Sequence, residues 1–86
     1  MADWQYVVLK PALKYLERMQ SDDQSRIIEA LDTLLVEPSL LDIKPLKGRS
    51  ELRLRVGKYQ VLFVEDTAKQ TYVVTMIGSR GDVYKS

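Results

Sequence analysis

The strongest constraint on the fold is the alternating pattern of residues 51–65, which read ELRLRVGKYQVLFVE. Apolar and polar residues alternate before Gly57-Lys58, and an apolar run that contains Gln60 follows it. Alternation of this kind is typical of strands with one buried face, and a two-residue loop that contains glycine typically joins such strands into a hairpin. We therefore predict antiparallel strands at 51–56 and 59–65, with position 56 opposite 59 and position 53 opposite 62.

The hairpin divides its side chains between two faces. The face predicted to lie against the rest of the protein carries Leu52, Leu54, Val56, Tyr59, Val61 and Phe63. The opposite, open face carries Glu51, Arg53, Arg55, Gln60, Leu62 and Val64. Charged residues are common on the open face of a half-buried sheet, so the arginines alone do not indicate a function. The two apolar residues there predict that the chain's own tail or a partner protein partly covers this face.

Two helices are predicted before the hairpin. Residues 4–9 favour a short strand, and Pro11 suits the first turn of a helix that reaches about Gln20. A second helix is predicted from Ser21 to Glu37, because apolar residues recur there at helical spacing. Ser21 and the glutamine three residues later form a capping-box pattern at its start.

The remaining segments complete an α+β prediction. Residues 39–50 contain a proline and a glycine without clear periodicity and are predicted to form a loop, and 71–77 is predicted as a last strand. The predicted order is β-α-α-β-β-β: an N-terminal strand, a two-helix hairpin and a three-stranded antiparallel meander. The helices are expected to pack on one sheet face.

Length and composition exclude several classes of function. The chain has 86 residues, and we expect a single domain over 1–86. It contains no cysteine and no histidine, which excludes disulfides, thiolate chemistry and the commonest metal-binding and acid–base groups. We expect no cofactor and no metal. No apolar stretch approaches the roughly 18 residues of a membrane span, which predicts a soluble cytoplasmic protein without membrane contact.

The formal charge of +1 conceals an uneven distribution. Residues 1–43 hold four basic and eight acidic side chains, whereas 44–60 hold six basic and one acidic. Such a density of cations is typical of surfaces that bind phosphates, and the planar arginine side chain suits this role. The six central cations are Lys44, Lys47, Arg49, Arg53, Arg55 and Lys58.

Four motifs, in this order, carry a family resemblance. WQYVVLKPA begins at Trp4, PLKG follows at 45–48, ELRLRVGKYQVLF spans 51–63, and IGSRGDVYK spans 77–85. The chain resembles the RelE/ParE superfamily of toxins from bacterial type II toxin–antitoxin systems, and its last motif resembles the RelE side. The resemblance implies a small antiparallel sheet with helices on one face. It also implies an endoribonuclease that enters the ribosomal A site, cuts messenger RNA and is neutralised by a cognate antitoxin. Operator DNA would be a partner only through the antitoxin complex.

In such toxins the RNA 2′-hydroxyl attacks the adjacent phosphate without a metal. By resemblance, the catalytic residues are Arg53, Arg80 and Tyr84. The predicted RNA-binding residues are Lys44, Lys47, Arg49, Arg55, Lys58 and Gln60, and the predicted antitoxin contacts are Leu62 and Val64. Lys44 matches the place of a general base in some relatives, a role that would need burial among other cations to lower its pKa.

Two departures from the family pattern keep other functions open. Glu51 stands where some RelE-like toxins have lysine, and Gln60 stands where the family usually has arginine. One lost transition-state contact costs on the order of 10²–10³ in rate, so an attenuated enzyme is compatible with the sequence. A ParE-like DNA gyrase inhibitor on the same fold is one alternative. A silent homologue that acts only within an antitoxin complex is another.

Overall fold

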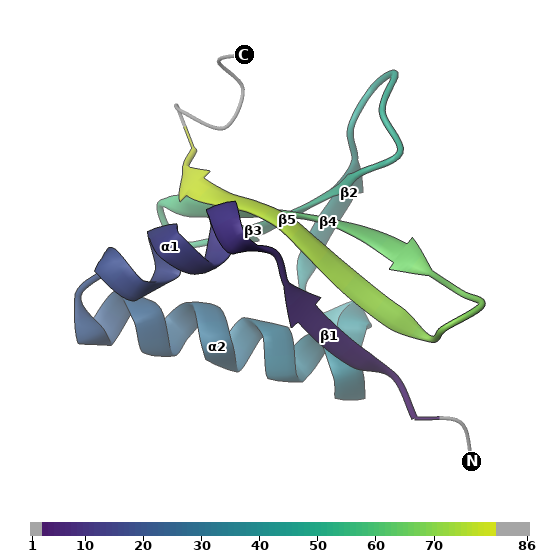
Figure 1. The fold of residues 1–86 in the computed structure, drawn as a ribbon, viewed down its shortest axis with the longest axis horizontal. Coiled ribbons are helices and arrows are strands. Elements are labelled where there is room, and N and C mark those ends of the chain that lie inside the picture. The colour runs from purple at the N-terminus through teal and green to yellow at the C-terminus, as the bar shows by residue number, and fades with distance from the viewer. Residues whose placement is uncertain (1–2, 81–86) are drawn as a thin grey trace.

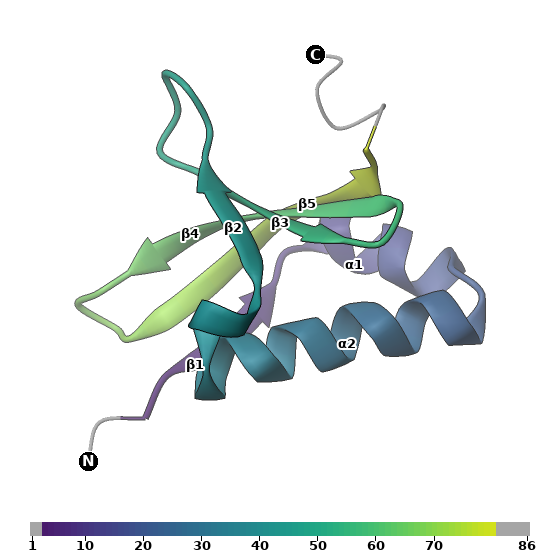
Figure 2. The same ribbon diagram turned by 180° about the vertical axis from the view of Figure 1, so that it is seen from behind.

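A computed structural model describes residues 3–80 as an α+β fold in which two helices cover one face of a five-stranded sheet (Figures 1 and 2). The elements, in chain order, are β1 (Gln5–Val8), α1 (Lys10–Arg18), α2 (Ser21–Val36), a 3₁₀ helix (Pro38–Leu40), β2 (Asp42–Pro45), β3 (Leu52–Val56), β4 (Tyr59–Asp66) and β5 (Thr71–Ser79).

The sheet has the strand order β1-β5-β4-β3-β2. Strands β2 to β5 form an antiparallel meander, and β1 lies parallel to β5 at the other edge. The predicted hairpin register is confirmed, since Val56 lies opposite Tyr59 and Arg53 opposite Leu62. Gly57 has a φ of +57°, a conformation that glycine adopts without the steric penalty of other residues.

The predicted loop over residues 39–50 is wrong in part, because β2 forms within it and pairs with β3. The meander therefore has four strands where three were predicted. Pro45 misled the prediction, since proline usually interrupts strands. Here it is the last residue of an edge strand, where its missing N–H removes no hydrogen bond from the interior of the sheet.

The predicted capping box at Ser21 is also wrong. Helix α2 begins at Ser21 itself, and the preceding cap residue, Gln20, makes no side-chain capping bond. Gln24 instead donates from Nε2 to the backbone oxygen of Leu16, 3.0 Å away. The side chain that was expected to cap α2 therefore ties its first turn to the end of α1.

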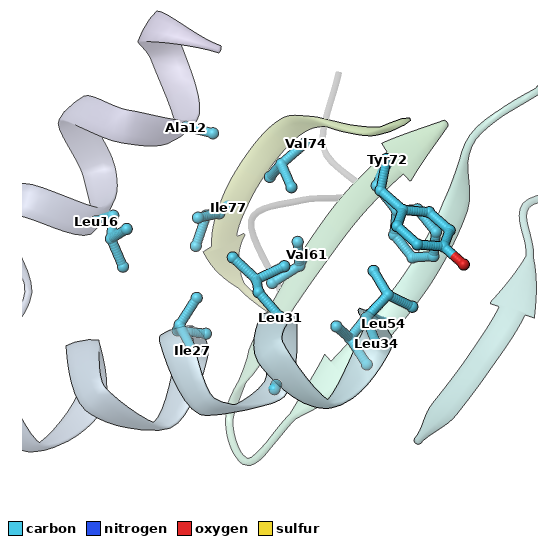
Figure 3. Packing of buried hydrophobic residues seen from close by; sticks show 12 residues of the cluster. Ala12, Leu16, Ile27, Leu31, Leu34, Leu54, Val61, Tyr72, Val74 and Ile77 are labelled. Carbon is cyan, nitrogen blue, oxygen red and sulfur yellow. The ribbon is translucent and has the colours of Figure 1, made fainter. Parts of the chain in front are cut away.

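The core lies between the helices and the sheet (Figure 3). Its aromatic members are in direct contact: the Phe63 and Tyr72 rings meet edge to face with centroids 5.7 Å apart, and Trp4 packs on Tyr72 at 4.6 Å. The fully or nearly buried members are Ala12, Leu16, Ile27, Ala30, Leu31, Leu34, Leu54, Val61, Phe63, Tyr72, Val74 and Ile77. The inward orientation predicted for the hairpin's apolar face is confirmed at Leu54, Val61 and Phe63.

A β-bulge interrupts the pairing of β4 with β5. Leu62 lies opposite Met76, but its neighbour Phe63 lies opposite Val74, so Thr75 is the extra residue. Val74 and Ile77, three positions apart, consequently both face the core.

We predict that Leu31→Ala lowers the free energy of unfolding by about 2–5 kcal/mol, because it leaves a cavity at a side chain that is fully buried on α2. Urea denaturation would measure the change. The matched control is Leu40→Ala on the 3₁₀ helix, where the side chain is 71% exposed and the expected change is below about 0.5 kcal/mol. Equal losses in the two variants would contradict this placement of the core.

Candidate functional site

Two rows of side chains cross the open face of the sheet, the face opposite the helices. Paired residues in neighbouring strands point to the same face, so the strand register defines both rows. The first row is Lys44, Arg53, Leu62 and Met76, and the second is Asp42, Arg55, Gln60 and Gly78. Four of the predicted site residues are therefore brought together on this face: Lys44, Arg53, Arg55 and Gln60.

The two arginines share an acidic neighbour that the sequence did not reveal. Asp42 Oδ1 lies 3.9 Å from Arg53 Nη2, and Asp42 Oδ2 lies 3.8 Å from Arg55 Nε. Arg53 is buried and Arg55 is half-buried, whereas 44% of the Asp42 side chain is exposed. Asp42 was missed because its segment was predicted to be a loop, and only a strand at 42–45 brings it beside the arginines.

On the open face, the Glu51 side chain links the start of β3 to the β2–β3 loop and to β5. Its Oε2 accepts a hydrogen bond of 2.8 Å from Thr75 Oγ1, and its Oε1 forms an ion pair with Arg49 Nη2. Because β4 lies between β3 and β5, the Glu51 side chain crosses β4 to reach Thr75. The residue that departs from the family pattern therefore anchors the β2–β3 loop to the bulge of β5.

The expected exposure of Leu62 is wrong, because only 1% of this residue is exposed. Gln60 is also 1% exposed, so it is not an open phosphate contact. Leu62 lies on an inner strand, in register between Arg53 on β3 and Met76 on β5, so long side chains flank it on both sides. Val64 is half-buried and retains some exposure. Binding roles for these residues remain predictions.

The remaining predicted cations lie at separate places around the sheet. Lys47 lies in a turn closed by the hydrogen bond from Arg49 N to Leu46 O, within the loop that projects beyond the sheet in Figures 1 and 2. The Lys58 ammonium lies 5.6 Å from the centroid of the Tyr59 ring, on the helix side of the hairpin. Arg80 is exposed and donates its backbone N–H to Lys58 O at 3.0 Å. Lys58 therefore does not share the open face with the arginines, and Tyr84 lies outside the described residues.

A comparison with known proteins identifies the family. No family model matches the chain. The chain is 31% identical over 81 residues to RelE1 of Methanocaldococcus jannaschii, whose name describes it as a toxin, and the match covers 90% of each protein. The chain belongs to the RelE toxin family. The sequence resemblance is thereby confirmed on its RelE side.

Solved structures show that the RelE fold covers nearly all of this chain. The archaeal RelE–RelB complex from Pyrococcus horikoshii OT3 matches with a TM-score of 0.76 and 23% identity, over 94% of this chain and 98% of that one. The toxin–antitoxin complex RelBE2 from Mycobacterium tuberculosis also gives 0.76, with 17% identity, over 92% and 100% of the two chains. The predicted α+β architecture is thus that of RelE.

This RelE-family chain has a second polar region, on the helix side of the β3–β4 hairpin. A cleft of about 440 Å³ is lined there by Tyr15, Arg18, Met19, Gln20, Asp23, Lys58 and Tyr59. Tyr59 donates from its hydroxyl to Asp23 Oδ2 at 2.8 Å, and its ring meets Tyr15 edge to face. The hydrogen bond to Asp23, followed by burial and the charge of the same carboxylate, raises the pKa of Tyr59 above its ordinary value of 10.0.

Metal sites and membrane spans have requirements with which residues 3–80 can be compared. These residues contain no group of three or more carboxylates close enough to hold a metal ion. None of the helices in the same part of the chain is long and apolar enough to cross a membrane.

We predict that Asp23→Asn lowers the pKa of Tyr59, because the substitution removes the acceptor charge that favours the neutral phenol. Tyrosinate absorbance measured against pH would report the shift, and subtraction of the Tyr59→Phe curve would isolate this residue. Since the folded-state pKa is raised, the contribution of the pair to stability is complete below about pH 10 and declines as the pH rises through the raised value. An unchanged Tyr59 titration in Asp23→Asn would contradict the contact.

Proposed function

We propose that this RelE-family chain is the toxin of a type II toxin–antitoxin system and acts as a ribosome-dependent mRNA endonuclease. The main support is the pair of cross-strand rows on the open face. In these rows Lys44, Arg53 and Arg55 lie on neighbouring strands of a RelE fold. Cations held on rigid strands suit a phosphodiester whose negative charge increases in the transition state.

The proposed reaction uses the RNA's own 2′-hydroxyl as the nucleophile. Arg53 and Arg80 would stabilise the charge that develops on the phosphate oxygens, and Tyr84 would orient the substrate. Lys44 is exposed on the edge strand β2, so we assign it a phosphate contact rather than proton abstraction. With no histidine in the chain, acid–base assistance is weak, which is consistent with an enzyme that depends on the ribosome to position its substrate.

An antitoxin is the proposed protein partner, as in the RelE–RelB complexes that share this fold. The open face carries an apolar strip beside the polar rows. Val7, Val73 and Val64 lie in register on β1, β5 and β4, and Met76 follows on β5. Val7 and Met76 are each 43% exposed. A partner that covers this strip would bury apolar surface next to the cations and block the approach of RNA.

We predict that Arg80→Ala lowers the rate of messenger RNA cleavage on translating ribosomes by a factor of about 10² or more, because one transition-state cation is lost. Mapping of mRNA 5′ ends after in vitro translation would measure cleavage. Lys14→Ala on α1 is the matched control, since it removes one exposed positive charge on the helix side and should leave cleavage unchanged.

Three outcomes would contradict the site assignment or the proposed activity. Full cleavage by Arg80→Ala and Tyr84→Phe would reject the site assignment. Absence of cleavage by the unmodified protein, together with inhibition of supercoiling by purified gyrase, would favour the ParE-like alternative. Normal growth upon full expression, without either activity, would favour the silent homologue.

A further inference from the structure

Asp42 occupies a defined position between the two arginines of the open face. It lies on the edge strand β2, directly opposite Arg55 and diagonal to Arg53. Each of its carboxylate oxygens faces a different guanidinium group, at 3.9 Å for Arg53 and 3.8 Å for Arg55. The carboxylate thus presents two oxygens to two guanidinium groups, as a phosphodiester can.

The contacts of Asp42 with Arg53 and Arg55 are ion pairs that partly neutralise the positive charge of the arginines, and they are too long to be hydrogen bonds. Both distances exceed the 2.7–3.2 Å of an N–H···O hydrogen bond. In the described part of the chain, Arg55 Nε is buried and makes no hydrogen bond. An anion that bonds this donor directly would therefore replace a longer-range ion pair with a charge-assisted hydrogen bond, which is stronger.

The neighbouring strand adds an acceptor in the same row. Gln60 lies opposite Arg55, and its Oε1 is buried without a hydrogen-bond partner among residues 3–80. The row therefore contains one donor and one acceptor without hydrogen-bond partners among residues 3–80. Phosphate oxygens accept hydrogen bonds and so complement the Arg55 donor, whereas Gln60 is 1% exposed and is closed to a ligand in this conformation.

We propose that Asp42 is an internal substitute for an RNA phosphate, held beside Arg53 and Arg55 and displaced when RNA binds. Its exposed position on an edge strand allows its side chain to turn away to solvent without disturbing the core. The proposal deepens the proposed function and rests on its RNA-directed part. Asp42 keeps the two arginines at low net charge until a phosphate takes its place, and it reduces binding of weakly competing anions.

The test is the affinity of the full chain for a fluorescently labelled single-stranded RNA oligonucleotide, measured by anisotropy over a range of salt concentrations. Asp42→Asn is expected to bind roughly 3–10-fold more tightly at low salt. The slope of log affinity against log salt should become steeper by about 0.7, the value of one further phosphate contact on a single strand. Asp42→Ser should behave in the same way, which guards against a specific effect of asparagine.

Two controls separate a local effect from a general change in charge. Glu17→Gln removes one exposed negative charge from α1, on the helix side, and should leave RNA affinity within about twofold of the unmodified protein. Asp42→Asn combined with Arg55→Ala should lose the gain, because the freed guanidinium is absent. A gain that persists without Arg55 would overturn the proposal.

The outcomes also distinguish this inference from the proposed function. Equal or weaker RNA binding by both Asp42 variants would overturn the inference and leave ribosome-dependent cleavage open. An Arg55-dependent gain in RNA affinity, in a protein that does not cut messenger RNA on ribosomes, would support the phosphate site and reject the nuclease. Failure of the unmodified chain and of both variants to bind RNA would overturn the inference.

Discussion

The pairing of β3 with β4 is the constraint on which the other features of this protein depend. A shift of one residue in this register would turn one of the two strands over: either Val61 and Phe63 of β4 would leave the core, or Leu54 of β3 would leave it and the arginines would lie against the helices. The short loop at Gly57-Lys58 excludes that shift, because it fixes Val56 opposite Tyr59. The hydrophobic core and the cationic face are therefore two consequences of one turn.

The sequence predicted the hairpin, both helices and the last strand because each has a strong periodic pattern. It failed at β2, whose four residues include a proline and are too few to display alternation. Because β2 was not predicted, Asp42 was not expected beside Arg53 and Arg55. The sequence therefore indicated two arginines without an acidic partner. The burial of Leu62 could not be predicted either, since it lies between Arg53 and Met76 on two neighbouring strands. Alternation gives the face on which a residue lies, but not which long side chains cover it.

Ion pairs in the folded protein partly neutralise the cations of residues 44–60. Arg49 is paired with Glu51, and Arg53 and Arg55 share Asp42. Lys44, Lys47, Arg49 and Arg80 are exposed. Under the proposed function, the exposed cations would attract the RNA backbone over a distance, whereas the partly neutralised Arg53 and Arg55 would act only on a phosphate that has arrived. Arg80 would then contribute both to attraction and to chemistry.

The bulge at Thr75 has a consequence for the last part of β5. Along a regular strand, positions 76 and 78 would share a face with Tyr72 and Val74, which point toward the helices. The extra residue reverses this phase, so that Met76 and Gly78 pair with residues of the open face. One inserted residue therefore decides which side chains the last part of β5 presents to each side of the sheet. A one-residue deletion here would bring Met76 to the helix side and Ile77 to the open face.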